Sequence, residues 1–176
     1  MKKVRIVVLV LLCAVMVGRG DSWARSIQVD AVEAVSIKPA KGSDRLRFLM
    51  RFTLPDSLQG HSIDFACVSF GASCSGKEGG VSFQAFALST DWEAETVSWY
   101  NPWERPGGDW DESSSSYWIS ENGADAKLCF DVTWFANAWL KEPSKNFGVL
   151  VKVSGPFLGS FSVSGTEGIP KLNILY

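Results

Sequence analysis

Residues 91–106 read DWEAETVSWYNPWERP and place three tryptophans, one tyrosine and two prolines within sixteen residues. Val97 and Trp99 are two positions apart, so their side chains share one face of an extended strand. This spacing predicts a strand at a sheet edge, with Trp92 closing a loop before it. The two prolines exclude a helix or a central strand over residues 100–106. We therefore expect this part to leave the sheet as a rigid aromatic loop that forms a binding surface.

Residues 100–116 show no hydrophobic period and are expected to form a long irregular segment. Loops beyond about 12–15 residues are uncommon unless they are functional or disordered. It contains Trp103 and Trp110, with glycines, prolines and charged residues around them. These neighbours predict that both indoles stand in water, and rings folded back onto the domain are the alternative. Exposed indoles bind the apolar faces of sugar rings, and polar neighbours bind the hydroxyls. The predicted carbohydrate-binding residues are Tyr100, Trp103, Glu104, Arg105, Asp109, Trp110, Asp111 and Tyr117.

Hydrophobic alternation along the rest of the chain predicts an all-β protein with about nine strands. The expected strands are residues 26–38 (one long or two short strands), 45–54, 63–70, 81–88, a strand beginning at 117, 126–133, 147–153, 157–163 and 170–176. Residues 63–70 and 81–88 are expected to pair as a hairpin. Residues 134–140 are expected to form one short helix, capped by Asp131 or Thr133. The spacing of turn signals is typical of an antiparallel β-sandwich of jelly-roll type.

One predicted strand has a charged face. In residues 45–54 the apolar side chains alternate onto one face, and Arg45, Arg47 and Arg51 fall on the other. Half-buried strands need charged outer faces, so we interpret the arginines as a solvated face or as partners of neighbouring carboxylates. A cradle for an acidic sugar is the alternative.

The run WEAETVSW at residues 92–99, followed by Asn101-Pro102, resembles a signature of the DNRLRE domain family. Further stretches resemble that family in the same order, namely residues 51–55, 63–70, 131–133, 146–153 and 170–176. The resemblance covers about residues 45–176, whereas residues 26–42 depart from the family's opening strand and turn. It implies a secreted, non-catalytic β-sandwich of a kind found beside polysaccharide-acting enzymes or on cell surfaces, with some relatives classed as carbohydrate-binding modules. Together with the alternation of Val97 and Trp99, it implies that Trp92 and Trp99 are core residues. It implies no particular binding residues.

The amino terminus is predicted to be a signal peptide, residues 1–24. A basic start is followed by an apolar run of thirteen residues, 6–18, and by Ser22-Trp23-Ala24, a small-x-small cleavage pattern. A membrane anchor is the alternative, but it needs about 20 apolar residues. We therefore expect one domain, residues 25–176, that is secreted to the extracellular space or cell surface, with the periplasm as the alternative and no membrane attachment after cleavage.

Charge and cysteine content limit the partners of the exported chain. Removing residues 1–24 takes four basic residues and one acidic residue from totals of 17 and 19, which leaves a net charge of about −5 and argues against nucleic acid. Three cysteines remain, and an oxidising compartment allows one bridge among them. We expect Cys67 to pair with Cys74, because Gly71 offers a turn between them. Three free thiols, including Cys129, are the alternative.

Catalytic and metal chemistry have weak support. His61 is the only histidine, and no serine motif of a hydrolase accompanies it. No cofactor is predicted, and calcium on Asp109, Asp111 and Glu112 is the alternative. The sequence thus predicts a non-catalytic module that binds a polysaccharide or cell-surface glycan through its aromatic loop. The alternatives are an extracellular structural or adhesion protein with a protein partner, and a small polysaccharide-degrading enzyme using two acids from residues 93–112.

Overall fold

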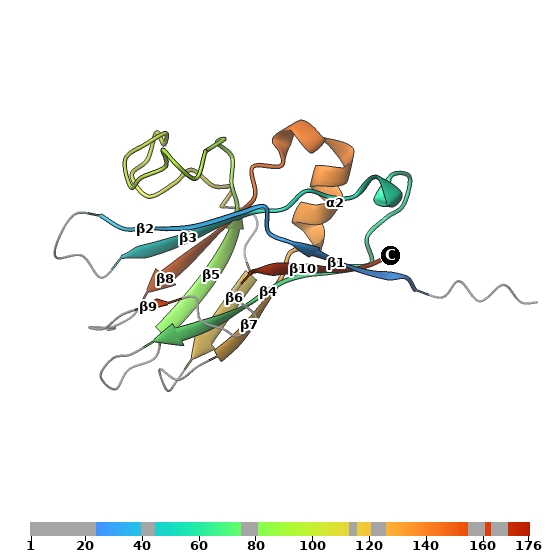
Figure 1. Ribbon diagram of the computed structural model, residues 1–176, viewed down its shortest axis with the longest axis horizontal. Helices are drawn as coiled ribbons and strands as arrows, with labels where there is room; N and C mark the ends of the chain where they lie inside the picture. Colours follow the sequence, from blue (N-terminus) through green and yellow to red (C-terminus); the bar gives the residue numbers. More distant parts are fainter. Residues whose placement is uncertain are drawn as a thin grey trace, which may run out of the picture.

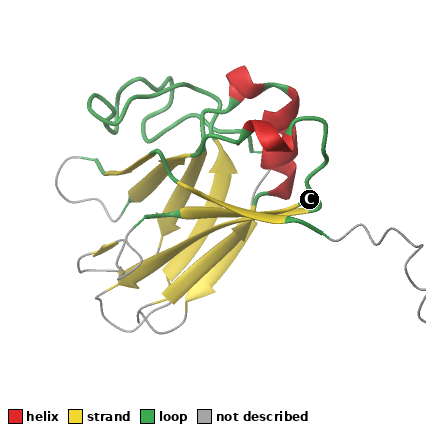
Figure 2. Cartoon of the chain, turned by 45° about the vertical axis from the view of Figure 1, so that its right-hand side comes forward, coloured by secondary structure: helices red, strands yellow, loops and turns green. Residues whose placement is uncertain are grey.

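The computed structural model describes residues 24–39, 45–74, 81–112, 116–120, 126–154, 161–162 and 169–176. The predicted signal peptide lies outside these residues apart from Ala24. Two antiparallel sheets and one short α-helix make up the described fold, which confirms the prediction of a mostly β protein (Figures 1 and 2). None of the described helices is long and apolar enough to span a bilayer.

The first sheet has the strand order β1-β10-β4-β7, with the short β9 also paired to β4. Its strands are β1 (Ser26–Asp30), β10 (Lys171–Leu175), β4 (Phe65–Cys74), β7 (Ala126–Asp131) and β9 (Phe161–Ser162). The chain therefore closes by inserting its last strand between β1 and β4.

The second sheet has the strand order β2-β3-β8-β5-β6. Its strands are β2 (Glu33–Ile37), β3 (Leu46–Arg51), β8 (Val149–Ser154), β5 (Val81–Ala87) and β6 (Ser116–Ser120). The expected hairpin of residues 63–70 and 81–88 is wrong, because β4 and β5 belong to different sheets. Residues 26–38 form two short strands, also in different sheets. The described residues hold ten strands, so the count of about nine is not confirmed.

The main core lies where the two sheets face each other. Alternate side chains of β3, β5 and β8 contribute, among others, Met50, Phe83 and Val151, and the first sheet contributes Val68 and Phe130; all five are at most 1% exposed. Complete burial of one such side chain is worth about 1.5–3 kcal/mol. This inner face is the period-two pattern predicted from the sequence.

The helix α2 (Thr133–Lys141) closes one end of this core with the buried Phe135 and Trp139. It confirms the predicted helix. Asp131 accepts a hydrogen bond from the Thr133 N–H at 2.9 Å, so one of the two predicted capping residues contacts the first turn. The short 3-10 helices η1 (Asp56–Leu58) and η2 (Pro143–Lys145) lie in the neighbouring connections.

The second sheet is apolar on its outer face too. Leu49, Phe86 and Leu150 point away from the main core and are at most 4% exposed. Residues 89–112, named here the covering loop, lie over them (Figure 1). The strand predicted around Val97 and Trp99 is wrong, since this loop consists of turns. Its backbone pairs with the sheet only through one isolated β-bridge, Leu88 to Trp110.

Candidate functional site

The tryptophans of the covering loop point down onto the sheet. Trp92, Trp99 and Trp103 are 2%, 6% and 7% exposed. The core positions predicted for Trp92 and Trp99 are confirmed, whereas the prediction that Trp103 stands in water is wrong. Its indole N–H donates to the Ser98 carbonyl at 2.8 Å, so the polar end of the ring is satisfied inside the loop and the ring is buried without leaving a donor unpaired.

Glycines make this burial possible, although the sequence analysis took the glycines near Trp103 as a sign that its indole stands in water. Gly107 has φ +92, and a Cβ there would lie 2.8 Å from Cζ2 of Trp99. Gly108 has φ +116, and a Cβ there would lie 2.5 Å from Cδ1 of Leu150. Both positions need positive φ and close approach, which glycine alone tolerates. The glycines therefore let the loop backbone lie against the indole and the sheet, instead of holding the rings in solvent.

Asp109 organises the second half of the covering loop. Its Oδ2 accepts hydrogen bonds from the Glu104 N–H at 2.9 Å and the Thr90 hydroxyl at 3.1 Å, and its Oδ1 accepts one from the Arg105 N–H at 2.9 Å. Burial alone raises the pKa of Asp109, but these three hydrogen bonds and the Arg105 charge together lower it below its ordinary value. This carboxylate is a structural clamp, and its oxygens are already occupied.

Trp110 is half-buried, and charged groups occupy its surroundings. Its ring lies 5.5 Å from that of Phe86, and its centroid is 4.9 Å from Cζ of Arg105, 5.1 Å from Nζ of Lys152 and 5.9 Å from Cζ of Arg47. Such cation–π contacts are worth about 0.5–2 kcal/mol each. An indole held in this way presents little free face for a sugar ring.

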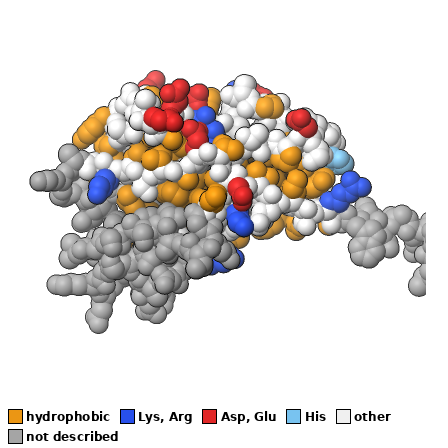
Figure 3. Space-filling view, in the orientation of Figure 1, with side chains coloured by type: hydrophobic (Ala, Val, Ile, Leu, Met, Phe, Trp, Pro, Cys, Tyr) orange, Lys and Arg blue, Asp and Glu red, His pale blue; other side chains and the backbone are white. Residues whose placement is uncertain are grey.

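The other predicted site residues do not form one surface. Tyr100 is 65% exposed, and Glu104 and Arg105 are exposed as well. The guanidinium of Arg105 pairs with Glu112 at 3.2 Å and also donates to the Trp110 carbonyl. Asp111 is half-buried, and Tyr117 lies in β6 opposite Gln84, with its side chain outside what the structure describes. Figure 3 shows acidic side chains gathered over the covering loop.

Two arginines of the charged strand face, Arg51 and Arg47, have different roles. Arg51 pairs with Glu33 at 3.2 Å and with Asp91 at 2.7 Å, donates to the Trp92 carbonyl, and so anchors the start of the covering loop. It fits the interpretation as a partner of carboxylates. Arg47 does not, because it is 7% exposed and no described carboxylate lies within ion-pair distance of it.

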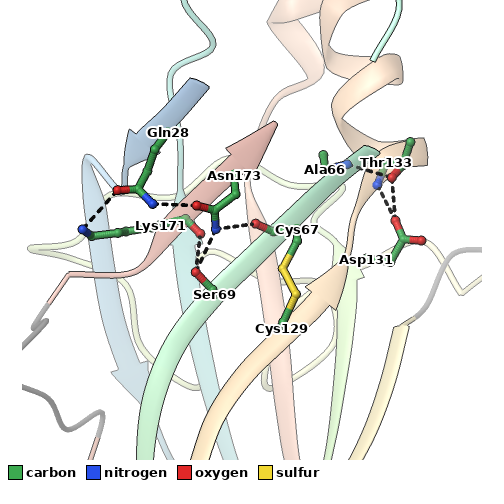
Figure 4. Close-up of a disulfide and its surroundings, with 9 residues drawn as sticks. All are labelled: Gln28, Ala66, Cys67, Ser69, Cys129, Asp131, Thr133, Lys171 and Asn173. Carbon is green, nitrogen blue, oxygen red and sulfur yellow. Dashed lines mark hydrogen bonds between the residues drawn. A yellow bond between two sulfur atoms is a disulfide. The ribbon is translucent and has the colours of Figure 1, made fainter. Parts of the chain in front are cut away.

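A second surface, missed by the sequence analysis, lies on the outer face of the first sheet (Figure 4). Gln28 donates to Asn173 at 2.6 Å, Lys171 donates to Gln28 at 3.2 Å, and Asn173 donates to Ser69 at 2.9 Å. These side chains border an open hollow of about 580 Å³. An adjoining hollow of about 530 Å³ shares Phe65, which is 40% exposed. We name this surface the polar trough.

Gln28 and Asn173 of the trough are 145 positions apart in sequence, so no local pattern shows that they are neighbours. The signal that exists is alternation, because Gln28, Asn173 and Ser69 each occupy the outward positions of their strands. Only the tertiary structure shows which residues of the three strands lie opposite one another. Once registered, the side chains form one hydrogen-bonded row across β1, β10 and β4.

The disulfide beside the trough corrects the predicted pairing. Cys67 bonds to Cys129, with their Cα atoms 5.8 Å apart (Figure 4). The predicted Cys67–Cys74 bond is wrong, because both residues lie in β4, where seven residues of extended chain span about 23 Å. In the β4–β7 register Cys129 lies opposite Ser69, so it is a diagonal neighbour of Cys67 on the same face.

Among the described residues, no group of three histidine, cysteine or acidic side chains is placed to hold a metal ion. Asp109, one of the three acids named in the calcium alternative, accepts three hydrogen bonds from the covering loop. No protein-family model matches the chain, and no curated protein sequence is significantly similar to it. The function therefore has to be argued from the geometry of the two surfaces.

Proposed function

We propose that this protein is an exported, non-catalytic module that binds carbohydrate, and that the polar trough holds the sugar. The observation that carries the proposal is an exposed aromatic ring, Phe65, beside an open hollow bordered by a preformed row of amide, hydroxyl and ammonium groups. Sites for polar small molecules combine an apolar contact with a few placed polar groups. A sugar ring presents both kinds of surface.

The row has hydrogen-bonding capacity left for a ligand. An ammonium group has three donors, and Lys171 uses one on Gln28. Each side-chain amide has two donors and two acceptor sites, and Gln28 uses one donor and one acceptor site within the row. Because the side chains already hold one another in place, a ligand does not have to order them, which lowers the entropic cost of binding.

Other features are consistent with this function. The Cys67–Cys129 disulfide fits an oxidising, extracytoplasmic compartment and so supports export. Two antiparallel sheets around one core support the proposal of a β-sandwich of jelly-roll type, as does the resemblance to the DNRLRE family. The covering loop is not the proposed sugar site, since Trp103 is buried and Trp110 is engaged by cations.

A protein partner is the second candidate, favoured by one observation. Trp134, on the first turn of α2, is 60% exposed and makes an edge contact with Phe135. Exposed tryptophans are enriched where proteins associate. This candidate is supported if the wild-type protein binds a protein partner that Trp134→Ala does not bind.

Calorimetric titration with a panel of neutral and acidic polysaccharides tests the proposal. Phe65→Ala and Asn173→Ala are each expected to weaken binding about tenfold or more, corresponding to loss of about 1.4 kcal/mol. Tyr100→Ala is the matched control, because it removes an exposed aromatic ring from the covering loop and is expected to leave affinity unchanged.

Two results contradict the proposal in different ways. Binding that is lost in Tyr100→Ala and kept in Phe65→Ala places the sugar on the covering loop and removes the trough from the argument. Absence of binding to every polysaccharide in the panel, by a protein with native circular dichroism, rejects the carbohydrate function itself.

A further inference from the structure

A buried guanidinium that forms no ion pair with any described carboxylate lies under the covering loop. Arg47 is 7% exposed, its Nη1 donates to the Leu46 carbonyl at 3.0 Å, and its buried Nε has no acceptor. Arginine has five N–H donors and stays charged at neutral pH. Its remaining contacts are with the faces of Trp99, at 5.2 Å, and Trp110, at 5.9 Å. A buried charge left in this way is costly unless an anion balances it.

Further cations lie beside Arg47. Lys152 is its register partner on β8, and Arg45 lies two positions before Arg47 in sequence, just ahead of β3. Burial, with the charge of Arg45 added, lowers the pKa of Arg47 to about 10. Burial, together with the charges of Arg47 and Arg45, lowers the pKa of Lys152, although Glu112 opposes this. The positive charges therefore act on one another at short range.

Two acidic side chains of the covering loop near this cluster, Glu112 and Asp109, have other partners. Glu112 pairs with Arg105 at 3.2 Å, and Asp109 holds the loop through both its oxygens. The cluster of Arg45, Arg47 and Lys152 thus keeps an excess of positive charge beside two indoles.

We propose that Arg47 and Lys152 form a binding site for an oxyanion, a carboxylate or sulfate group, at the edge of the covering loop. A planar guanidinium and a neighbouring ammonium match the paired oxygens of such a group. The indoles of Trp99 and Trp110 lie against the guanidinium, and its buried Nε has no acceptor among the described residues. The site is on the opposite sheet from the polar trough and is independent of the sugar site proposed there.

Tryptophan fluorescence and thermal unfolding, followed against sodium sulfate with sodium chloride at equal ionic strength as the reference, test the proposal. Saturable quenching or enhancement is expected, because two indoles contact the guanidinium. At about ten times its Kd, sulfate is expected to raise Tm by about 3–6 °C beyond the chloride reference. Sodium galacturonate and polygalacturonate, tested in the same way, show whether a free ion or a carboxylate carried on a sugar polymer binds better.

Arg47→Met and Lys152→Met are expected to abolish the saturable signal, and Lys171→Met, in the trough, is expected to keep it. Without sulfate, Arg47→Met is expected to have an unchanged or higher Tm, since an apolar side chain replaces an uncompensated buried charge. If Arg47→Met does not fold, the sulfate response of Lys152→Met still tests the proposal, because Lys152 is only half-buried. Equal responses of the wild-type protein and Lys152→Met to sulfate would show general salt exclusion and overturn the site.

Discussion

Replacing Asp109 with alanine is the sharpest test of how the covering loop is held. The carboxylate accepts hydrogen bonds from Glu104, Arg105 and Thr90, at 2.9, 2.9 and 3.1 Å, and is 6% exposed. The substitution removes all three bonds and leaves the donors without an acceptor. We expect the loop to lose its fixed shape while both sheets stay folded.

The size of the effect follows from these contacts. A hydrogen bond to a charged group contributes about 1.5–3 kcal/mol, but Glu104 and Arg105 lie in an exposed part of the loop where water replaces part of the loss. The ion pair with Arg105 spans 3.7 Å and involves a half-exposed side chain, so it adds little. We expect Asp109→Ala to lower the free energy of unfolding by about 3 kcal/mol, or Tm by about 6–12 °C.

The effect depends on pH in a defined direction. The folded pKa of Asp109 lies below its ordinary value, so the carboxylate stabilises the fold fully above its unfolded pKa of about 3.9. That contribution is lost as the pH falls through the lowered folded pKa. The stability difference between the wild-type protein and Asp109→Ala is therefore expected to be constant near neutral pH and to shrink below about pH 4.

Urea denaturation followed by tryptophan fluorescence and near-ultraviolet circular dichroism measures this difference. Glu95→Ala, an exposed acidic residue of the same loop, is the control and is expected to stay within about 0.5 kcal/mol of the wild-type protein. An Asp109→Ala variant that also falls within this margin refutes the argument that the carboxylate holds the loop.

Three further substitutions test other parts of the fold. Cys129→Ser opens a bridge between positions 62 apart and is expected to cost about 4 kcal/mol by urea denaturation; an equally stable variant contradicts a structural role for the bond. Gly148→Ala places a Cβ 2.1 Å from the Met50 carbonyl oxygen at φ +92, and we expect a loss above about 3 kcal/mol, or no soluble protein, whereas a native Tm would rule out this backbone. Trp103→Ala is expected to cost about 3–5 kcal/mol in the same assay, against about 0.5 or less for Tyr100→Ala, and equal costs would show that Trp103 is not buried.

The aromatic loop shows where sequence reasoning succeeds and fails. The alternation of Val97 and Trp99, together with the family resemblance, indicated that Trp92 and Trp99 are core residues, and both are buried. The same reasoning used the glycines after Pro106 as a sign of exposure for Trp103. A glycine permits positive φ and close backbone contact, so it equally allows a loop to fold down onto an apolar sheet face. Local composition does not distinguish these outcomes.

Local reading missed the polar trough and found only part of the oxyanion site, since it named Arg47 in an alternative cradle for an acidic sugar but not Lys152. The polar trough joins the first strand to the last, and the oxyanion site joins Arg47 to Lys152 across two neighbouring strands. The predicted Cys67–Cys74 bond needed a turn at Gly71, but Gly71 lies within the extended strand β4, which separates the two cysteines.

The sequence by itself determined the mostly β fold, most strand positions, the helix α2 and the inward face of β3, because period-two alternation is a local consequence of strand geometry. The tertiary structure alone decided which strands are neighbours, hence the Cys67–Cys129 bond, the polar trough and the burial of Trp103. Strand order depends on pairing between distant segments, and those pairings are fixed only when two sheets and a covering loop bury their apolar faces together.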